Sequence, residues 1–298
     1  MKKSLILSSM LAFTLLSACQ STSVPAPTAC KQWPQSNCYI DSTNVDAIIL
    51  NSDINAQNHE GLTPLMVARD AASVRSLITA KADVNLPSFD GKTAIFFANH
   101  DTIDLLIAAG ADLDVQVGPE VTALMLAIVH QDLDVVQKLI AGKADLTKRD
   151  INGYTALHYA TSIHQNLIEG DQQKVIQNVI DLTDPNPYTV HTKDHVVNPN
   201  NTYDAKVVYR TLNADLVTAL IAGGADVNAT DSRGRSPIFF ALDPKITSAL
   251  IAAGADAQLK DNDGITPSQV IQATDYHLPD GNQAILDVLS AAPKTEKK

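Results

Sequence analysis

The sequence predicts an all-α repeat solenoid of about five to six helix-turn-helix repeats, with a cap at each end. Three observations support this fold class. An Ala-Asp motif follows helix-length apolar stretches five times, most of its copies lie about thirty residues apart, and a second motif precedes the apolar stretches at a similar offset. Self-similarity at this period is typical of an array of supersecondary units rather than of one globular core. Such arrays offer binding surfaces more often than catalytic pockets.

The Ala-Asp motif marks the end of the second helix of each repeat. Gly precedes several of its copies, and Gly suits the position just after a helix C-terminus, where left-handed backbone is common. The interval of 33 residues marks a full-length repeat, those of 29 and 30 mark shortened repeats, and that of 81 locates an insert. The aspartates of the motif are Asp83, Asp112, Asp145, Asp226 and Asp256.

The second motif predicts a tight turn followed by a short first helix. Its glycine supplies the positive φ of the turn. The Thr or Ser two residues later is suited to cap the helix, and a Pro after it fits the first helical turn. The glycines of the motif are Gly61, Gly91, Gly153, Gly234 and Gly264.

The remaining elements follow in chain order. An N-terminal cap at 44–55 carries a single helix, and a C-terminal cap is expected at 284–290, because terminal repeats of an array must shield its ends. In the shortened first, second and fifth repeats, the second helices are expected to begin at Ser73, Asp101 and Lys245. The other expected helices are those at 45–50, 103–107, 135–140 and 214–223.

An insert at about 165–213 interrupts the fourth repeat between its two helices. Residues 171–182 are periodic and predict a helix, whereas the Pro- and Asn-rich stretch 183–201 predicts a loop. Residues 206–211 fit either a short strand or a helical lead-in. Inserts in repeat arrays map to loops on one face and are often functional, although long loops are also tolerated at little cost in free energy.

The paired motifs resemble ankyrin repeats, in which a β-turn finger is followed by two antiparallel helices. Thr63-Pro64-Leu65 and Thr155-Ala156-Leu157-His158 match the Thr-Pro-Leu-His signature of that family, and the likeness covers about residues 44 to 270. The resemblance implies that His158 bonds to the Thr155 hydroxyl. It also implies that this bond is absent where Met66, Phe96, Met125 and Phe239 replace the histidine, so that apolar packing substitutes for it.

In this family, fingertips and first helices line a concave groove that contacts protein partners. The resemblance therefore implies groove positions that include Asn58, His59, Glu120, Ile151, Asn262 and Ile265. The partner-binding candidates are Phe89, Lys92, Tyr154, Arg233 and Arg235, because aromatic residues and arginine are common interface anchors. For Tyr154, packing against the next finger is the alternative.

The N-terminus is a separate segment. Lys2 and Lys3 precede a twelve-residue apolar stretch, which is too short to span a bilayer, so residues 1–18 are interpreted as a signal peptide. Leu16-Ser17-Ala18-Cys19 resembles the processing site of bacterial lipoproteins, which implies acylation of Cys19, for example with palmitate. Gln20 in place of Asp favours the outer membrane, lipid-anchored on its periplasmic side. A soluble periplasmic protein is the alternative.

Residues 19–43 are interpreted as a lipid-anchored tether. Cys30 and Cys38 remain once Cys19 is assigned to lipid, and an oxidising compartment permits a disulfide between them. The ankyrin-repeat domain is expected at 44–291, and residues 292–298 are expected to be a disordered tail.

Composition excludes some functions. The formal net charge is −11, and loss of two lysines with the signal peptide makes it more negative, which argues against nucleic-acid binding. The sequence has no phosphate-binding Gly-rich loop and no nucleophile motif, so no enzyme activity and no cofactor are expected. His191 and His195 are four residues apart, a spacing that would suit Zn²⁺ only on a helix.

The predicted function is therefore that of a monomeric, periplasm-facing lipoprotein that binds a protein as a scaffold or inhibitor. One alternative is an immunity protein against a periplasmic toxin. A second is a metal-dependent or enzyme activity housed in the insert at 165–213. A third is protection of a periplasmic redox enzyme.

Overall fold

The computed structural model describes residues 28–29, 33–34, 38–162, 166–168, 175–176, 207–209, 214–273 and 282–293. The chain divides into two compact units. Unit 1 comprises Met1–Ala127 and Asp134–Asp150, and unit 2 comprises Ile128–Leu133 and Ile151–Lys298. No helix among the described residues is long and apolar enough to cross a membrane.

Unit 1 begins with a cap that starts earlier than the sequence indicates. Strand β1 (Thr28–Ala29) pairs in parallel with β2 (Cys38–Tyr39). Trp33 is buried, and its indole N–H donates to the Ala56 carbonyl at 2.7 Å. Ile40 is fully buried and exchanges backbone hydrogen bonds with Val67 and Arg69. The expected tether at 19–43 therefore extends too far, because Trp33 and Ile40 are buried and bonded to Ala56, Val67 and Arg69.

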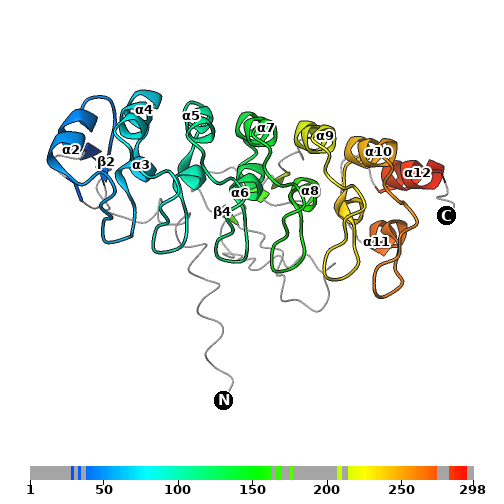
Figure 1. Cartoon of the computed structure of the whole chain (residues 1–298). Coiled ribbons are helices and arrows are strands. Elements are labelled where there is room, and N and C mark those ends of the chain that lie inside the picture. Colours follow the sequence, from blue (N-terminus) through cyan, green and yellow to red (C-terminus); the bar gives the residue numbers. More distant parts are fainter. Residues whose placement is uncertain are drawn as a thin grey trace, which may run out of the picture. The chain divides into compact units, whose positions relative to one another are not determined.

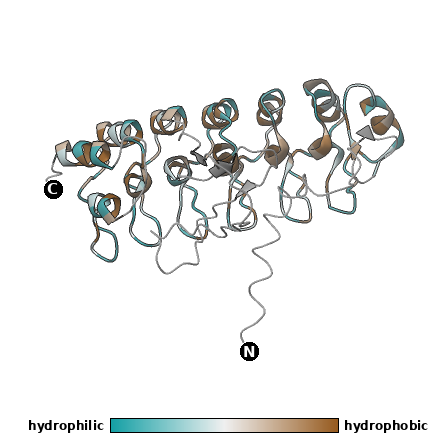
Figure 2. Ribbon diagram, turned by 180° about the vertical axis from the view of Figure 1, so that it is seen from behind, coloured by the Kyte–Doolittle hydropathy of each residue, from teal (hydrophilic) through white to brown (hydrophobic). Residues whose placement is uncertain are grey.

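The helices of unit 1 form two layers. The second helices α2, α4, α5 and α7 lie side by side, and the shorter first helices lie between them and the projecting loops (Figure 1). Hydrophobic residues gather on the helices, whereas the projecting loops are mostly hydrophilic (Figure 2). The helices that lie wholly or mostly in unit 1 are α2 (Val45–Asn51), α3 (Pro64–Val67), α4 (Ala71–Thr79), the 3-10 helix η1 (Ala94–Phe97), α5 (Ile103–Ala108), α6 (Ala123–Val129) and α7 (Leu133–Ala141).

Unit 2 repeats this arrangement. Its helices are α8 (Ala156–Thr161), α9 (Ala214–Ala222), the 3-10 helix η2 (Pro237–Phe240), α10 (Pro244–Ala252), α11 (Pro267–Ala273) and α12 (Gln283–Ala291). Within the insert, β3 (Asn166–Ile168) pairs in antiparallel fashion with both β4 (Val175–Ile176) and β5 (Val207–Tyr209). The helix predicted at 171–182 is thus wrong at β4, and the strand alternative for 206–211 is confirmed at β5.

The first helices of the shortened repeats are short. These are single turns of four residues in α3, η1 and η2, and each is followed by a non-helical alanine. The second helices then begin at Ala71, Ile103 and Pro244, each within two residues of the expected position. Aspartate side chains cap two of these second helices: Asp70 accepts from the Ser73 N–H, and Asp243 accepts from the Lys245 and Ile246 N–H groups.

The Ala-Asp motif forms a ladder of side-chain hydrogen bonds between successive repeats. At four places the residue two positions after an aspartate (Asp53, Asp83, Asp112 or Asp226) accepts from the backbone N–H of the next motif aspartate. In unit 1, Asn55 Oδ1 accepts from Asp83, Asn85 from Asp112, and Asp114 from Asp145, at 2.7–2.8 Å. In unit 2, Asn228 accepts from Asp256 at 2.8 Å. The recurring motif therefore joins repeats as well as ending helices.

Asn85→Ala is expected to lower the free energy of unfolding by about 1–2 kcal/mol, because it removes two hydrogen bonds of ordinary strength. Asn85 accepts from Asp112 and its Nδ2 donates to the Gly110 carbonyl at 3.0 Å. Asn85→Asp keeps the acceptor and loses only the donor, so about half of the loss is expected. Urea titration followed by circular dichroism measures both variants. Equal losses in the two would show that the accepted bond contributes nothing.

Candidate binding surface

Five-residue hairpins, here called fingers, project from each repeat and make up the candidate surface. A polar residue opens most of them and folds the turn. Asn58 Oδ1 accepts from the backbone N–H of Glu60 and Leu62, and Asp231 Oδ1 accepts from Arg233 and Arg235 in the same geometry. Asp261 repeats the pattern. The six fingers are residues 58–62, 88–92, 117–121, 150–154, 231–235 and 261–265.

Sequence reasoning missed this role. Asn58 was expected to face a partner, but it is 6% exposed and its side chain is used inside the finger. The available signal was a polar residue three positions before each finger glycine. An Asn or Asp at such a place folds the backbone locally through its side-chain oxygen. These residues are therefore part of the scaffold and not of the contact surface.

Neighbouring fingers touch within each unit. In unit 1, a Cβ placed on Gly61 would lie 2.4 Å from the backbone nitrogen of Phe89, so finger 2 rests on the glycine of finger 1. Gln57 Nε2 bridges the same pair by donating to the carbonyls of Gly61 and Pro87. In unit 2, the Asn262 N–H donates to the Arg233 carbonyl at 2.9 Å. The fingers are therefore held in fixed register and do not move independently.

Tyr154 and Arg235 do not belong to the accessible surface, which corrects their assignment as partner-binding residues. They are 6% and 4% exposed. The Arg235 guanidinium forms an ion pair with Asp231 at 2.7 Å, donates to the Tyr154 hydroxyl at 2.9 Å, and lies over the Phe240 ring. Tyr154 packs on the next finger, as the alternative interpretation proposed. A buried arginine requires paired acceptors, and this site supplies them.

His158 completes this buried network. Its Nδ1 accepts from the Thr155 backbone N–H at 3.1 Å and lies 2.9 Å from the Thr155 hydroxyl, which confirms the predicted contact. Because an N–H can only donate, Nδ1 is the unprotonated ring nitrogen, and Nε2–H therefore donates to the Arg235 carbonyl at 3.0 Å. At three of the four positions where Met or Phe replaces the histidine, the Thr63, Thr93 and Ser236 hydroxyls are buried without a hydrogen-bond partner. At the fourth, the Thr122 hydroxyl accepts from the Met125 N–H at 3.3 Å.

The other candidates lie nearer the surface. Phe89 is 72% exposed at the tip of finger 2. Lys92 in the same finger forms an ion pair with Asp90 at 2.7 Å, and its side chain is 22% exposed. Burial raises the pKa of the Asp90 carboxyl, but Lys92 and the Ser88 hydroxyl outweigh this and hold the pKa below its usual value. Arg233 is partly exposed. Their role in binding stays a prediction.

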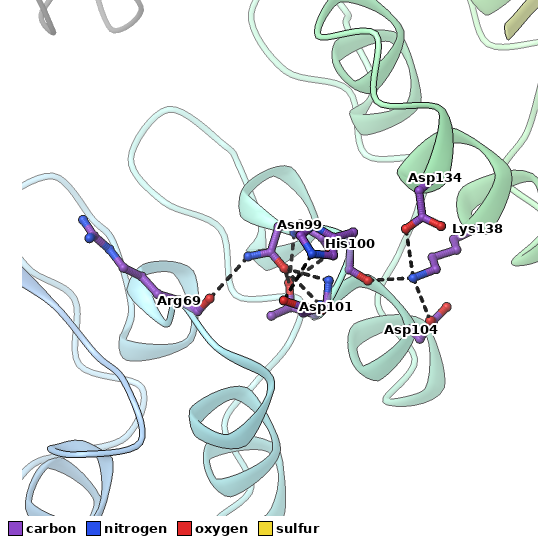
Figure 3. A network of polar contacts seen from close by, with 8 residues as sticks. Arg69, Asn99, His100, Asp101, Asp104, Asp134 and Lys138 are labelled. Carbon is purple, nitrogen blue, oxygen red and sulfur yellow. Dashed lines mark hydrogen bonds and ion pairs between the residues drawn. The ribbon is translucent and has the colours of Figure 1, made fainter. Parts of the chain in front are cut away.

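A second polar network joins repeats on the helical side of unit 1. Lys138 Nζ lies 3.1 Å from Asp104 and 3.0 Å from Asp134, and donates to the His100 carbonyl (Figure 3). Hydrogen bonds to Asp134 and Asp104 raise the pKa of Lys138. Asn99 links the same region to the preceding repeat through the Arg69 carbonyl. Lys138 thus serves packing between repeats and is not available as a free cation.

Several predicted sites fall outside the described residues. These are Cys19, Cys30, His191 and His195, together with the tail at 294–298. Cys38 is described and is disulfide-bonded, but its expected partner Cys30 is not described. Among the described residues, no group of three or more His, Cys, Asp or Glu side chains is arranged to hold a metal ion.

Comparisons with known proteins agree with this architecture. A family model described as Ankyrin repeats (3 copies) matches residues 99–170. Ankyrin repeat and SOCS box protein 6 of Pongo abelii is 29% identical over 134 residues, which are 44% of this chain and only 30% of that protein. The chain therefore spans less than a third of this curated relative.

Two solved structures share the fold. An ankyrin repeat domain from Acinetobacter baumannii AYE is 21% identical with a TM-score of 0.51, over 74% of this chain and 90% of that one. The ankyrin repeat domain of Bcl-3, a member of the IκB family, is 21% identical with a TM-score of 0.57, over 84% of this chain and 94% of that one. From its fingers, its paired helices and these likenesses, the chain contains ankyrin repeats and has the ankyrin-repeat solenoid fold.

Proposed function

We propose that this chain is a protein-binding scaffold or inhibitor that holds its partner at the periplasmic face of the outer membrane. Ankyrin repeats generally mediate protein–protein interaction rather than catalysis, which is the coarse part of the proposal. The observation that carries it is the exposure of large apolar side chains at fingertips: Phe89 is 72% exposed and Ile151 63% exposed. Rigid loops that present apolar anchors are suited to bind a protein surface.

Fixed geometry also supports binding. The fingers at 58–62, 88–92, 117–121, 231–235 and 261–265 are closed by their own hydrogen bonds. Backbone hydrogen bonds join neighbouring fingers in unit 2, and Gln57 links the first two fingers in unit 1. A preorganised surface loses little conformational entropy when a partner binds, so more of the contact energy appears as affinity. The inhibitor role rests on the same property, since a rigid surface can cover a partner's site without rearranging.

The membrane anchor rests on the N-terminal sequence. Cys19 follows Leu16-Ser17-Ala18, and the first buried side chain of the described residues is that of Trp33, fourteen residues later. Fourteen residues span at most about 50 Å when fully extended. A lipid on Cys19 would therefore hold the repeats close to the membrane surface, and the expected partner is a protein that reaches this layer of the periplasm.

The anchor is tested by metabolic labelling with radioactive palmitate. The chain is expected to take up label and to sediment with outer membranes, and Cys19→Ser is expected to lose the label and the sedimentation together. Cys38→Ser is the control for loss of a cysteine elsewhere, because it breaks the disulfide at Cys38 but leaves Cys19 intact. Label retained in Cys19→Ser, or a wild-type chain found in the soluble periplasm, would contradict the anchor.

Partner binding is tested by photo-crosslinking in intact cells. The crosslinking amino acid p-benzoylphenylalanine is placed at fingertip positions 59, 89, 151 and 232, and at position 50 on α2 as a control. Protein adducts are expected from fingertip positions and not from position 50. If no fingertip position captures a protein, the scaffold function is wrong.

A further inference from the structure

Two pairs of repeats in this chain align residue for residue, so one pair serves as an internal reference for the other. Repeats 1 and 2 lie in unit 1, and repeats 4 and 5 contribute the same finger and first-helix positions in unit 2. Four positions decide the comparison: Leu62 corresponds to Tyr154, Met66 to His158, Lys92 to Arg235, and Phe97 to Phe240.

In unit 2, the first-helix phenylalanine is contacted by three neighbouring side chains and is only partly exposed. Phe240 has its ring centroid 5.5 Å from that of Tyr154 and 5.9 Å from that of His158, and the Arg235 guanidinium lies 4.7 Å from it. In unit 1, the shorter Leu62 and Met66 replace the two rings, and Lys92 pairs with Asp90 instead. Phe97 is therefore left 39% exposed.

The fingertip of repeat 2 is also more apolar than its counterpart in unit 2. Phe89 contacts the glycine of the preceding finger, and Ser232 and Asn262 make the equivalent contact in unit 2. Small polar residues therefore satisfy this packing, and the fold does not require an aromatic ring at Phe89. Among the described residues, four large hydrophobic side chains are exposed, and repeat 2 supplies two of them, Phe89 and Phe97. Single exposed apolar residues are ordinary, but two on one repeat whose counterparts are polar or only partly exposed indicate a contact site.

Acidic residues flank this aromatic site. Finger 2 contacts finger 1 through Gly61, and a Cβ placed on Gly91 of finger 2 would lie 3.6 Å from the Val117 side chain of finger 3. The fingers of unit 1 project side by side (Figure 1). Finger 1 carries Glu60, whose side chain is 53% exposed, and finger 3 carries the exposed Glu120. His59 Nε2 lies 3.7 Å from the Glu60 carboxylate in the same finger. Among the described residues, no lysine or arginine forms an ion pair with Glu60 or Glu120.

We propose that Phe89 and Phe97, flanked by Glu60 and Glu120, form a docking face for a protein segment that presents apolar side chains between lysines or arginines. The proposal rests on the proposed binding function and names the chemistry of the partner. Lys92, the cation within this face, is neutralised by Asp90 at 2.7 Å, so the face attracts positive charge. Carboxylates at the rim of an aromatic contact increase the association rate of a cationic partner and disfavour an acidic one.

Photo-crosslinking in cells that produce the full chain tests the proposal, with p-benzoylphenylalanine at position 89. The captured protein segment, identified by mass spectrometry, is expected to carry net positive charge and apolar residues. Glu60→Lys with Glu120→Lys in the same chain is expected to reduce the adduct yield about tenfold, because the steering charge is reversed. Asp46→Lys, an exposed acid on α2 of the same unit, is the matched control and leaves the yield unchanged.

The aromatic contribution is tested with the crosslinking residue moved to position 59. Phe89→Ser, which installs the residue of finger 5, is expected to reduce the yield at least tenfold, whereas Leu50→Ser leaves it unchanged. Phe89 and Leu50 are both strongly exposed, at 72% and 82%, so neither change should disturb folding. Unaltered circular dichroism and thermal midpoint check this point.

The outcomes separate this inference from the function on which it rests. The docking face is overturned by any of three results: capture of a neutral or acidic segment, capture of lipid, or an adduct yield that does not change on charge reversal. Protein adducts from positions 151 and 232 but none from 59 or 89 also overturn it, while the binding function stands. The absence of protein adducts from every fingertip removes both.

Discussion

Asp231→Ala is expected to lower the free energy of unfolding of unit 2 by about 3–5 kcal/mol, the usual cost of removing one partner from a buried ion pair. The Asp231 side chain is fully buried in the ion pair with Arg235, whose own side chain is 5% exposed. Its Oδ1 also accepts from the Arg233 and Arg235 N–H groups, so the finger loses its fold as well. Urea unfolding followed by circular dichroism measures the loss.

Two companion variants make this result specific. Asp263→Ala removes an exposed carboxylate from the next finger and should stay within about 0.5 kcal/mol of wild type. Arg235→Met in the Asp231→Ala background should recover part of the loss, because no uncompensated charge remains buried. If the double variant is no more stable than Asp231→Ala, the loss of stability comes from the finger backbone and not from the unpaired charge of Arg235.

Gly61→Ala is expected to lower the free energy of unfolding of unit 1 by about 2–5 kcal/mol, the sum of a left-handed backbone penalty and an overpacking penalty. Gly61 has φ of +76°, and a Cβ there would lie 2.4 Å from the Phe89 backbone nitrogen. A flexible side chain could rotate away, but backbone cannot. Finger 2 must therefore shift as a whole, which breaks its register with finger 1.

Gly110→Ala separates the two contributions. Gly110 lies in the same unit with φ of +85°, and a Cβ there would have no neighbour within 4 Å. It should therefore show only the backbone penalty of about 1–2 kcal/mol. Both variants are measured by thermal and urea unfolding. Equal losses in the two would mean that the contact between fingers 1 and 2 is not tight in solution.

Much of the fold could be predicted from the sequence because its elements are encoded locally. Apolar periodicity located α5, α7 and α9 to within two residues at each end. The finger glycine and the Ala-Asp motif marked the turns, and the unequal motif intervals marked the shortened repeats and the insert. Each of these signals lies within about ten residues of the structure it specifies, so no knowledge of the tertiary fold is needed to interpret it.

The errors share a cause. Residues 19–43 are expected to be a tether, yet Trp33 within that range bonds to Ala56, 23 residues away. The helix expected at 171–182 has periodicity, but Val175–Ile176 pairs with β3 instead. In both places a partner outside the local window decides the conformation, because a buried backbone or indole group must find a hydrogen bond wherever the chain provides one.

In the candidate binding surface, too, local sequence decides some features and distant contacts decide others. The sequence by itself determined that the chain is a repeat array with fingers, and that Phe89 occupies a fingertip. It did not determine which fingertip side chains are accessible. Tyr154 and Arg235 look alike as interface residues in the sequence, but they bond to each other across 81 positions and are buried.

Only the tertiary structure decided this, because burial of a side chain depends on which repeat packs against it. In repeats 4 and 5 the packing positions hold Tyr154, His158 and Arg235, which contact Phe240 and leave it only partly exposed. In repeats 1 and 2 the same positions hold smaller or differently paired residues, so Phe97 stays exposed. Local sequence fixes the helices and turns, whereas solvent exposure is a property of two repeats together.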